Sequence, residues 1–121
     1  MTYHPRIPEL LALEGWYGPF KLSCRFNDIL RASNSKHFIS CFRKGGTHEK
    51  QREKRCVNPH WAVIYVPDRS GNFIGRAFVC WKDNILEVSK IYGNKLDFKI
   101  IKAHMSNINI QCRYAANDTY L

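Results

Sequence analysis

Four residues in the first half of the chain have the side chains of a structural zinc site: Cys41, His48, Cys56 and His60. Thiolate sulfur and imidazole nitrogen are the usual ligands of structural zinc, and four of them complete its tetrahedron. The spacings are Cys-x6-His and Cys-x3-His, without the Cys-x2-Cys pair of a zinc knuckle. Two interpretations therefore stay open: a zinc site, in which His37 could replace His48, or free thiols beside exposed histidines.

A strongly basic segment, residues 43–55, lies between these cysteines. It has no hydrophobic face, and its Gly45–Gly46 pair would let the backbone approach a ligand closely. We expect an exposed loop whose cations contact the phosphates of a nucleic acid, so that binding weakens as the salt concentration rises. The alternative is a charged surface that contacts only solvent. The expected contact residues, including two from the strands that follow, are Arg43, Lys44, Lys50, Arg52, Lys54, Arg55, Trp61 and Arg76.

The overall composition favours a partner that carries negative charge. Lys and Arg total 19 against 10 Asp and Glu, which gives a formal net charge of +9 over 121 residues. Such an excess favours nucleic acid or an acidic protein surface. Lys95, Lys99 and Lys102 have the spacing of one helix face and could extend a basic surface.

The cellular setting expected from the sequence is the cytoplasm. No apolar stretch approaches the ~20 residues that span a bilayer, and the first residues do not have the pattern of a secretory signal. The five cysteines are scattered and odd in number, so they do not form a simple disulfide framework. We therefore expect one intracellular domain, residues 1–121, with free thiols and no membrane partner.

Two short helices are expected before the basic segment. Pro8 suits the first turn of a helix and Gly15 its end, so "PELLALEG" predicts about two helical turns. In "RFNDILRASNS", Asn27 is the expected cap, and Ile29 and Leu30 are the expected buried pair. The aromatic segment "WYGPF" between these helices is expected to break the chain and to pack on the core.

Residues 60–92 predict a three-stranded antiparallel meander. "HWAVIYV" is continuously apolar and β-branched, as in a strand that is covered on both faces. "PDRSGN" and "KDN" are turn sequences, and they separate "FIGRAFVCW" from its two neighbours. Strict alternation in "FIGRAFVCW" places Phe73 on the face of Ala77, and Ile74 on the face of Arg76.

A third helix and a last strand complete the expected fold. "GNKLDFKIIKAHMSN" has Asn94 as its expected cap and Leu96, Ile100 and Ala103 as its expected buried stripe. "INIQCRY" alternates and predicts a final strand, and "HFISCF" (37–42) predicts a further short one. The sequence thus predicts an α+β domain with an antiparallel sheet of about four strands and two or three packed helices.

One hairpin of this sheet is similar to that of a nuclease family. Ile64–Tyr65 and Phe73–Ile74–Gly75, followed by Arg76, resemble the two signature tripeptides of the GIY-YIG nucleases. The similarity covers about a tenth of the chain, and Val63 and Phe73 stand where the family has Gly and Tyr. It implies metal-dependent cleavage, with an arginine and a metal-binding glutamate on a helix after the hairpin. Here a turn and a third strand are expected instead, and Glu87 lies on that strand.

These observations favour one function and leave two others open. We expect a small basic domain that binds nucleic acid through the 43–55 loop, with zinc as a candidate organiser of that loop. The first alternative is an inhibitor or adaptor of viral or mobile-element type that docks on an acidic partner protein. The second is a small nuclease that uses a histidine as acid or base. The histidines considered for that role are His37, His48, His60 and His104.

Overall fold

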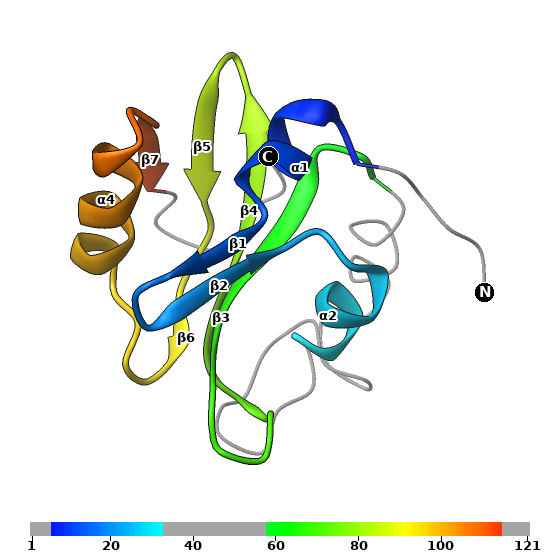
Figure 1. The fold of residues 1–121 in the computed structure, drawn as a ribbon, viewed down its shortest axis with the longest axis vertical. Helices are drawn as coiled ribbons and strands as arrows, with labels where there is room; N and C mark the ends of the chain where they lie inside the picture. The colour runs from blue at the N-terminus through cyan, green and yellow to red at the C-terminus, as the bar shows by residue number, and fades with distance from the viewer. Residues whose placement is uncertain (1–5, 33–57, 115–121) are drawn as a thin grey trace.

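A mixed β-sheet forms the centre of the protein. The computed structural model describes residues 6–32 and 58–114 (Figure 1). In these residues, seven strands form the sheet in the order β1-β2-β3-β4-β5-β7, and β6 pairs with β4. All paired strands are antiparallel except β5 and β7, which are parallel. The expected α+β fold is confirmed, with more strands than the four expected. The expected strand at 37–42 and the basic loop at 43–55 lie outside the described residues.

Along the described part of the chain, α1 is followed by two strands, α2 by four strands and α4 by one. The strands are β1 (Gly15–Tyr17), β2 (Phe20–Ser23), β3 (Trp61–Pro67), β4 (Phe73–Lys82), β5 (Ile85–Val88), β6 (Tyr92–Gly93) and β7 (Cys112–Tyr114). The helices are α1 (Pro8–Leu13), α2 (Phe26–Arg31) and α4 (Phe98–Asn107). None of these helices is long and apolar enough to cross a membrane.

Helices cover both faces of the sheet, and each face has its own apolar core. Leu10 of α1 and Ile101 and Met105 of α4 are fully buried on one face, which we call the α4 face. Ile29 and Ala32, from α2 and its end, are fully buried on the opposite face, which we call the α2 face. Apolar burial on both sides explains why β3 has no polar position in its sequence, as expected from "HWAVIYV".

The meander β3–β4–β5 is confirmed, and both of its turns follow from the turn sequences. In the first turn, the Asp68 carboxylate accepts hydrogen bonds from the backbone N–H groups of Ser70 and Asn72, each at 2.9 Å. In the second, Asp83 and Asn84 both have positive φ, 54° and 61°. Asp and Asn tolerate this left-handed conformation better than most residues, and a two-residue hairpin turn requires it.

The expected faces of Phe73 and Ile74 are wrong, because β4 contains a bulge. Val66 pairs with Gly75 but Pro67 pairs with Phe73, so Ile74 is an extra residue on β4. The bulge reverses the alternation before Gly75. Phe73 therefore packs in the core of the α2 face and Ile74 against that of the α4 face.

The segment "WYGPF" forms a hairpin rather than a simple break. Tyr17 pairs with Phe20, so Gly18 and Pro19 are the two loop residues between β1 and β2. Gly18 has a φ of 58°, which this tight turn needs and glycine adopts without strain. The hairpin adds two strands to the edge of the sheet beside β3.

Both expected helix caps are also wrong. Asn27 lies inside α2, and the N-cap residue is Arg25. In α4 the cap is Asp97, whose side chain accepts a hydrogen bond from the Ile100 N–H at 2.8 Å. Of the expected stripe, Leu96 is buried, Ile100 is partly buried and Ala103 is exposed, and the buried residues of α4 are Ile101 and Met105.

Candidate functional site

Most of the residues expected to bind nucleic acid or zinc lie outside the described part of the chain. This holds for all six cations of the 43–55 segment and for Cys41, His48 and Cys56. The structure therefore describes only Trp61, Arg76 and His60 of the expected sites. The zinc site stays a prediction, and the described residues by themselves hold no group of three or more His, Cys, Asp or Glu side chains placed to bind a metal.

Trp61 and Arg76 are buried in the structure. Trp61 is 3% exposed and Arg76 is fully buried on the α2 face. Because β4 is a central strand, the Arg76 head group does not reach water at a sheet edge. These two side chains therefore do not form part of an exposed binding surface.

Arg76 instead connects α2 to the sheet. Its Nε atom donates a hydrogen bond of 3.1 Å to the carbonyl oxygen of Ala32, at the end of α2. Its guanidinium carbon lies 4.6 Å from the ring centre of Phe78 and 4.5 Å from that of Tyr92. A planar guanidinium stacks favourably on aromatic faces, and burial strengthens this attraction. The residue thus holds the end of α2 in place.

Aromatic and cationic side chains alternate in a row across five strands of the α2 face. Directly paired residues on neighbouring strands have their side chains on the same face of a sheet. The Lys21 ammonium lies 5.8 Å from the ring centre of Trp16, at the β1 edge, where Trp16 is 58% exposed. The members of this row, in order from β1 to β6, are Trp16, Lys21, Tyr65, Arg76 and Tyr92.

Two exposed arginines of α2 lie beside this row. Arg31 donates a hydrogen bond of 2.8 Å to the Gly71 carbonyl, and its guanidinium carbon lies 5.0 Å from the ring centre of Phe73. Phe73 stacks on Tyr65 with ring centres 3.9 Å apart. Burial raises the pKa of Tyr65, with further contributions from the Asp28 and Glu14 carboxylates, and the charges of Arg31 and Arg25 oppose this. Carboxylates and arginines thus both contribute to the electrostatic field at this row.

We call the exposed part of this region the Trp16 surface, defined by Trp16, Lys21, Arg25 and Arg31. It combines an accessible indole with three cations on the face that α2 covers. Sequence patterns contain little signal for it, because "WYGPF" did not indicate a hairpin. The pairing of β1 with β2, and of β2 with β3, places Trp16 and Lys21 on the face of the sheet that α2 covers.

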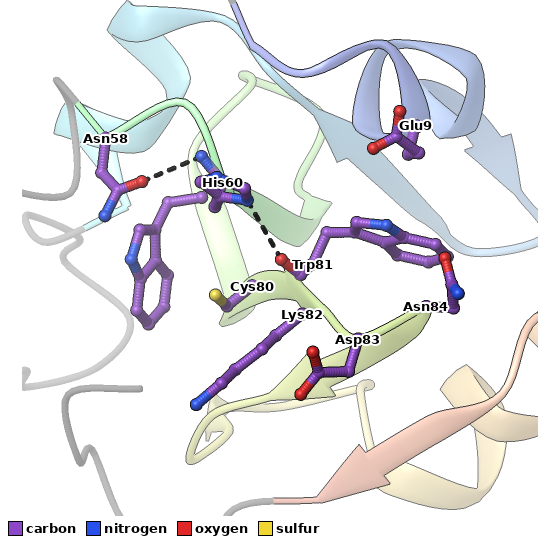
Figure 2. Close-up of a pocket in the computed structure, with 9 residues that line it drawn as sticks. Glu9, Asn58, His60, Cys80, Trp81, Lys82, Asp83 and Asn84 are labelled. Carbon is purple, nitrogen blue, oxygen red and sulfur yellow. Dashed lines mark hydrogen bonds between the residues drawn. The ribbon is translucent and has the colours of Figure 1, made fainter.

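A pocket of about 510 Å³ opens at the end of the sheet where β3 begins (Figure 2). Its walls come from α1, from the residues before β3, and from the end of β4 with its following turn. The His60 N–H donates to the Asn58 side chain at 2.9 Å, and His60 Nδ1 lies 3.3 Å from the Trp81 carbonyl oxygen. A carbonyl can only accept, so in this contact Nδ1 carries the proton and Nε2 of the neutral ring is an acceptor. That tautomer suits a metal ligand or a hydrogen-bond acceptor.

The charges around this pocket do not favour a phosphate. Two carboxylates, Glu9 and Asp83, line it together with a single cation, Lys82. Trp81 is partly exposed there and supplies an apolar wall. The lining thus suits a neutral or cationic group better than an anion.

The thiols of Cys24 and Cys112 do not have the lowered pKa of an activated nucleophile. Burial, with a further contribution from the Glu14 carboxylate, raises the pKa of Cys24 to about 12, although Arg6 opposes this. Burial raises the pKa of Cys112 to about 11, against the opposing charge of Lys102. A catalytic thiol needs a lowered pKa, because the thiolate is the reactive form.

The features expected of a nuclease are placed differently in the structure. A strand, β5, follows the hairpin where the GIY-YIG family continues into a helix. Glu87 is buried on that strand, and its carboxylate accepts a hydrogen bond of 3.0 Å from Arg113. His104 packs its ring edge-on against Phe20, with ring centres 5.6 Å apart. These side chains have structural contacts rather than the open arrangement of a catalytic centre.

The lysines of the C-terminal helix lie on the other side of the sheet. Lys99 and Lys102 are exposed on α4, and Lys95 precedes the helix with a φ of 64°. Since α4 packs on the α4 face and α2 on the opposite face, these lysines do not extend the Trp16 surface. They offer a matched set of cations for comparison with it.

Comparison with protein family models, curated proteins and solved structures finds no match for this chain.

Proposed function

We propose that the protein binds nucleic acid through the Trp16 surface together with the basic segment 43–55. The observation that carries the proposal is an exposed Trp16 with the Lys21 ammonium over its ring, on the face of the sheet that α2 covers with Arg25 and Arg31 exposed. An exposed indole and neighbouring cations are the two elements with which proteins hold a nucleic acid strand. Binding through an exposed indole and neighbouring cations needs no catalytic residues.

The basic run 43–55 follows α2 in the sequence. Arg31 is the last residue of α2, and the segment that contains the basic run leaves the described structure at Ala32. The run itself has six cations against two carboxylates. In the sequence, the run lies between the end of α2 and the start of β3.

Two carboxylates near this surface accept hydrogen bonds from neutral groups. Asp28 accepts a hydrogen bond of 2.6 Å from the Ser23 hydroxyl, and Glu14 accepts one of 2.8 Å from the Cys24 N–H. These bonds hold the carboxylates against β2 and its end. These neutral donors leave both carboxylates charged, so Lys21, Arg25 and Arg31 exceed the two carboxylates by one positive charge.

The proposal is tested by titrating the protein into fluorescently labelled RNA and DNA oligonucleotides at several salt concentrations. Each phosphate contact contributes a slope of about −0.7 to −0.9 to the plot of log affinity against log salt. The triple variant Arg52→Ala, Lys54→Ala, Arg55→Ala should bind more weakly and with a shallower slope. Binding that is insensitive to salt, or no binding to either nucleic acid, would overturn the proposal. A stable one-to-one complex with an acidic protein would then favour the inhibitor or adaptor function.

A further inference from the structure

We infer that the bound nucleic acid is single-stranded and that one of its unpaired bases stacks on Trp16. This inference rests on the proposed function, which it deepens by naming the kind of strand and the contact that selects it. Among the described residues, Trp16 is the most exposed of the large hydrophobic side chains, at 58%. A single exposed hydrophobic residue is common on protein surfaces, so the surroundings of Trp16 decide whether it is a binding residue.

The Trp16 ring is held in place although it is exposed. It meets the Tyr65 ring at an angle of 67°, with ring centres 6.5 Å apart, and the Lys21 ammonium lies over it. Tyr65 is in turn fixed by its stack on Phe73 and by the buried core of the α2 face. A ring that is already ordered loses little conformational entropy when a base stacks on it.

The edge position of β1 makes the ring accessible to an unpaired base. β1 is three residues long, and among the described residues it ends the sheet with one strand neighbour, β2. Bases in a duplex are stacked on each other and present only their edges, whereas bases of a single strand can turn outward onto an aromatic ring. Lys21 lies over the ring, and Arg25 and Arg31 are exposed on the same face of the sheet, so these cations can attract the phosphates of such a strand.

The same chemistry argues against an acidic protein on this surface. Carboxylates would form ion pairs with the three cations but would offer no aromatic surface to stack on the indole. A nucleotide offers an anionic phosphate and a flat aromatic base within one repeating unit, and the Trp16 surface offers a complement to each. Heparin, a polyanion without bases, separates the two contributions.

The experiment compares Trp16→Ala with Tyr114→Ala, a matched aromatic variant. Tyr114 is 43% exposed and lies on β7, at the opposite edge of the sheet. The probes are labelled oligo-dT and oligo-rU, a DNA duplex of the same length, and heparin. Loss of one base stack should weaken oligonucleotide binding by on the order of tenfold for Trp16→Ala. Tyr114→Ala should bind like the wild type, and Trp16→Phe should recover most of the loss.

Binding to the duplex and to heparin shows whether Trp16 contributes by stacking on a base or whether charge alone explains the binding. Trp16→Ala should leave binding to both probes within about twofold of the wild type, because neither presents an unpaired base. Unchanged oligonucleotide binding by Trp16→Ala, or an equal loss on all probes, would overturn the inference. If the triple variant of the basic run still weakens binding, that result would leave the proposed function standing. If the wild-type protein binds no nucleic acid, both the inference and the proposed function are wrong.

Discussion

The Nε atom of Arg76 lies 3.1 Å from the carbonyl oxygen of Ala32 and donates a hydrogen bond to it. This bond joins β4, a central strand, to the end of α2 (Figure 1). The two exposed arginines of α2 therefore owe their position on the sheet partly to a third, buried arginine. The Trp16 surface depends on this connection as well as on its own side chains.

Replacing Arg76 by Met should destabilise the fold. The change removes a charged donor from the Ala32 carbonyl and a cation from between the Phe78 and Tyr92 rings. A lost hydrogen bond to a charged group lowers the free energy of unfolding by about 1.5–3 kcal/mol. Urea unfolding measures the change. Arg69→Met, at an exposed turn position, is the control and should stay within about 0.5 kcal/mol. Equal stability of the two variants would show that Arg76 does not hold α2.

Two alanine substitutions distinguish the observed cap of α4 from the one expected from sequence. Asp97→Ala removes the side chain that accepts from the Ile100 N–H and should cost about 1 kcal/mol. Asn94→Ala should have a much smaller effect, because the Asn94 contact to Ile74 is made by its backbone N–H. Thermal unfolding followed by circular dichroism measures both. A larger loss for Asn94→Ala would contradict the observed start of α4.

The thiols of Cys24 and Cys112 should be protected from alkylation at about pH 8. Their raised pKa values, about 12 and about 11, keep them neutral there in the native protein. An unfolded thiol has a pKa of about 8.5, so only the unfolded chain releases these protons as the pH rises above that value. Stability is therefore fully present below about pH 8.5 and falls as the pH rises toward the native pKa values.

Brief iodoacetamide labelling followed by mass spectrometry checks this protection. Native protein should label at Cys24 and Cys112 far more slowly than protein in denaturant. In addition, Cys24→Ala should make the decline of stability above about pH 8.5 shallower. Labelling of native Cys24 at the rate of the unfolded chain would show that its sulfur is accessible to solvent rather than buried.

The substitution Cys56→Ser should leave the β3–β4–β5 meander folded, whether or not zinc binds. Within residues 6–32 and 58–114, buried side chains already form an apolar core on each face of this meander. Native mass spectrometry reports bound zinc, and two-dimensional NMR reports the fold of the sheet. One zinc in the wild type and none in the variant would support a site formed with Cys41, His48 and His60. Loss of the sheet signals in the variant would contradict a peripheral role for this cysteine.

Sequence patterns predicted the meander because its first strand is continuously apolar, its other strands are largely apolar, and its turns contain Asp, Asn and Gly. The same patterns failed where a long-range contact decides the outcome. The bulge at Ile74 coincides with the pairing of Gly75 with Gly93 on β6, eighteen positions later. A β-carbon on Gly75 would lie 2.3 Å from the Asn94 carbonyl oxygen, so this close approach explains why glycine stands there. Local alternation contains no information about such a contact.

For the candidate site, the sequence predicted only an excess of positive charge. The excess of Lys and Arg indicated an anionic partner, but it did not show which cations share a surface. Arg76 looked like a ligand contact because it interrupts an apolar strand, whereas its neighbours in space are Ala32, Phe78 and Tyr92. Trp16 looked like a core residue because the hairpin that exposes it depends on the pairing of β2 with β3.

The most direct test of the proposed function compares two pairs of cations on opposite faces of the sheet. Arg25→Ala with Arg31→Ala changes the α2 face, and Lys99→Ala with Lys102→Ala makes the same change of charge on the α4 face. Affinity for a labelled single-stranded oligonucleotide is measured for each at several salt concentrations. Unfolding curves confirm that both variants are folded.

We expect the arginine pair to weaken binding by about tenfold at roughly 0.1 M salt and to reduce the salt slope by about 1.4. The lysine pair should stay within about twofold of the wild type, because its cations lie on the other face of the sheet. Equal losses for the two pairs would mean that only the net charge attracts the strand. A larger loss for the lysine pair would place the binding surface on the α4 face and contradict binding at the Trp16 surface.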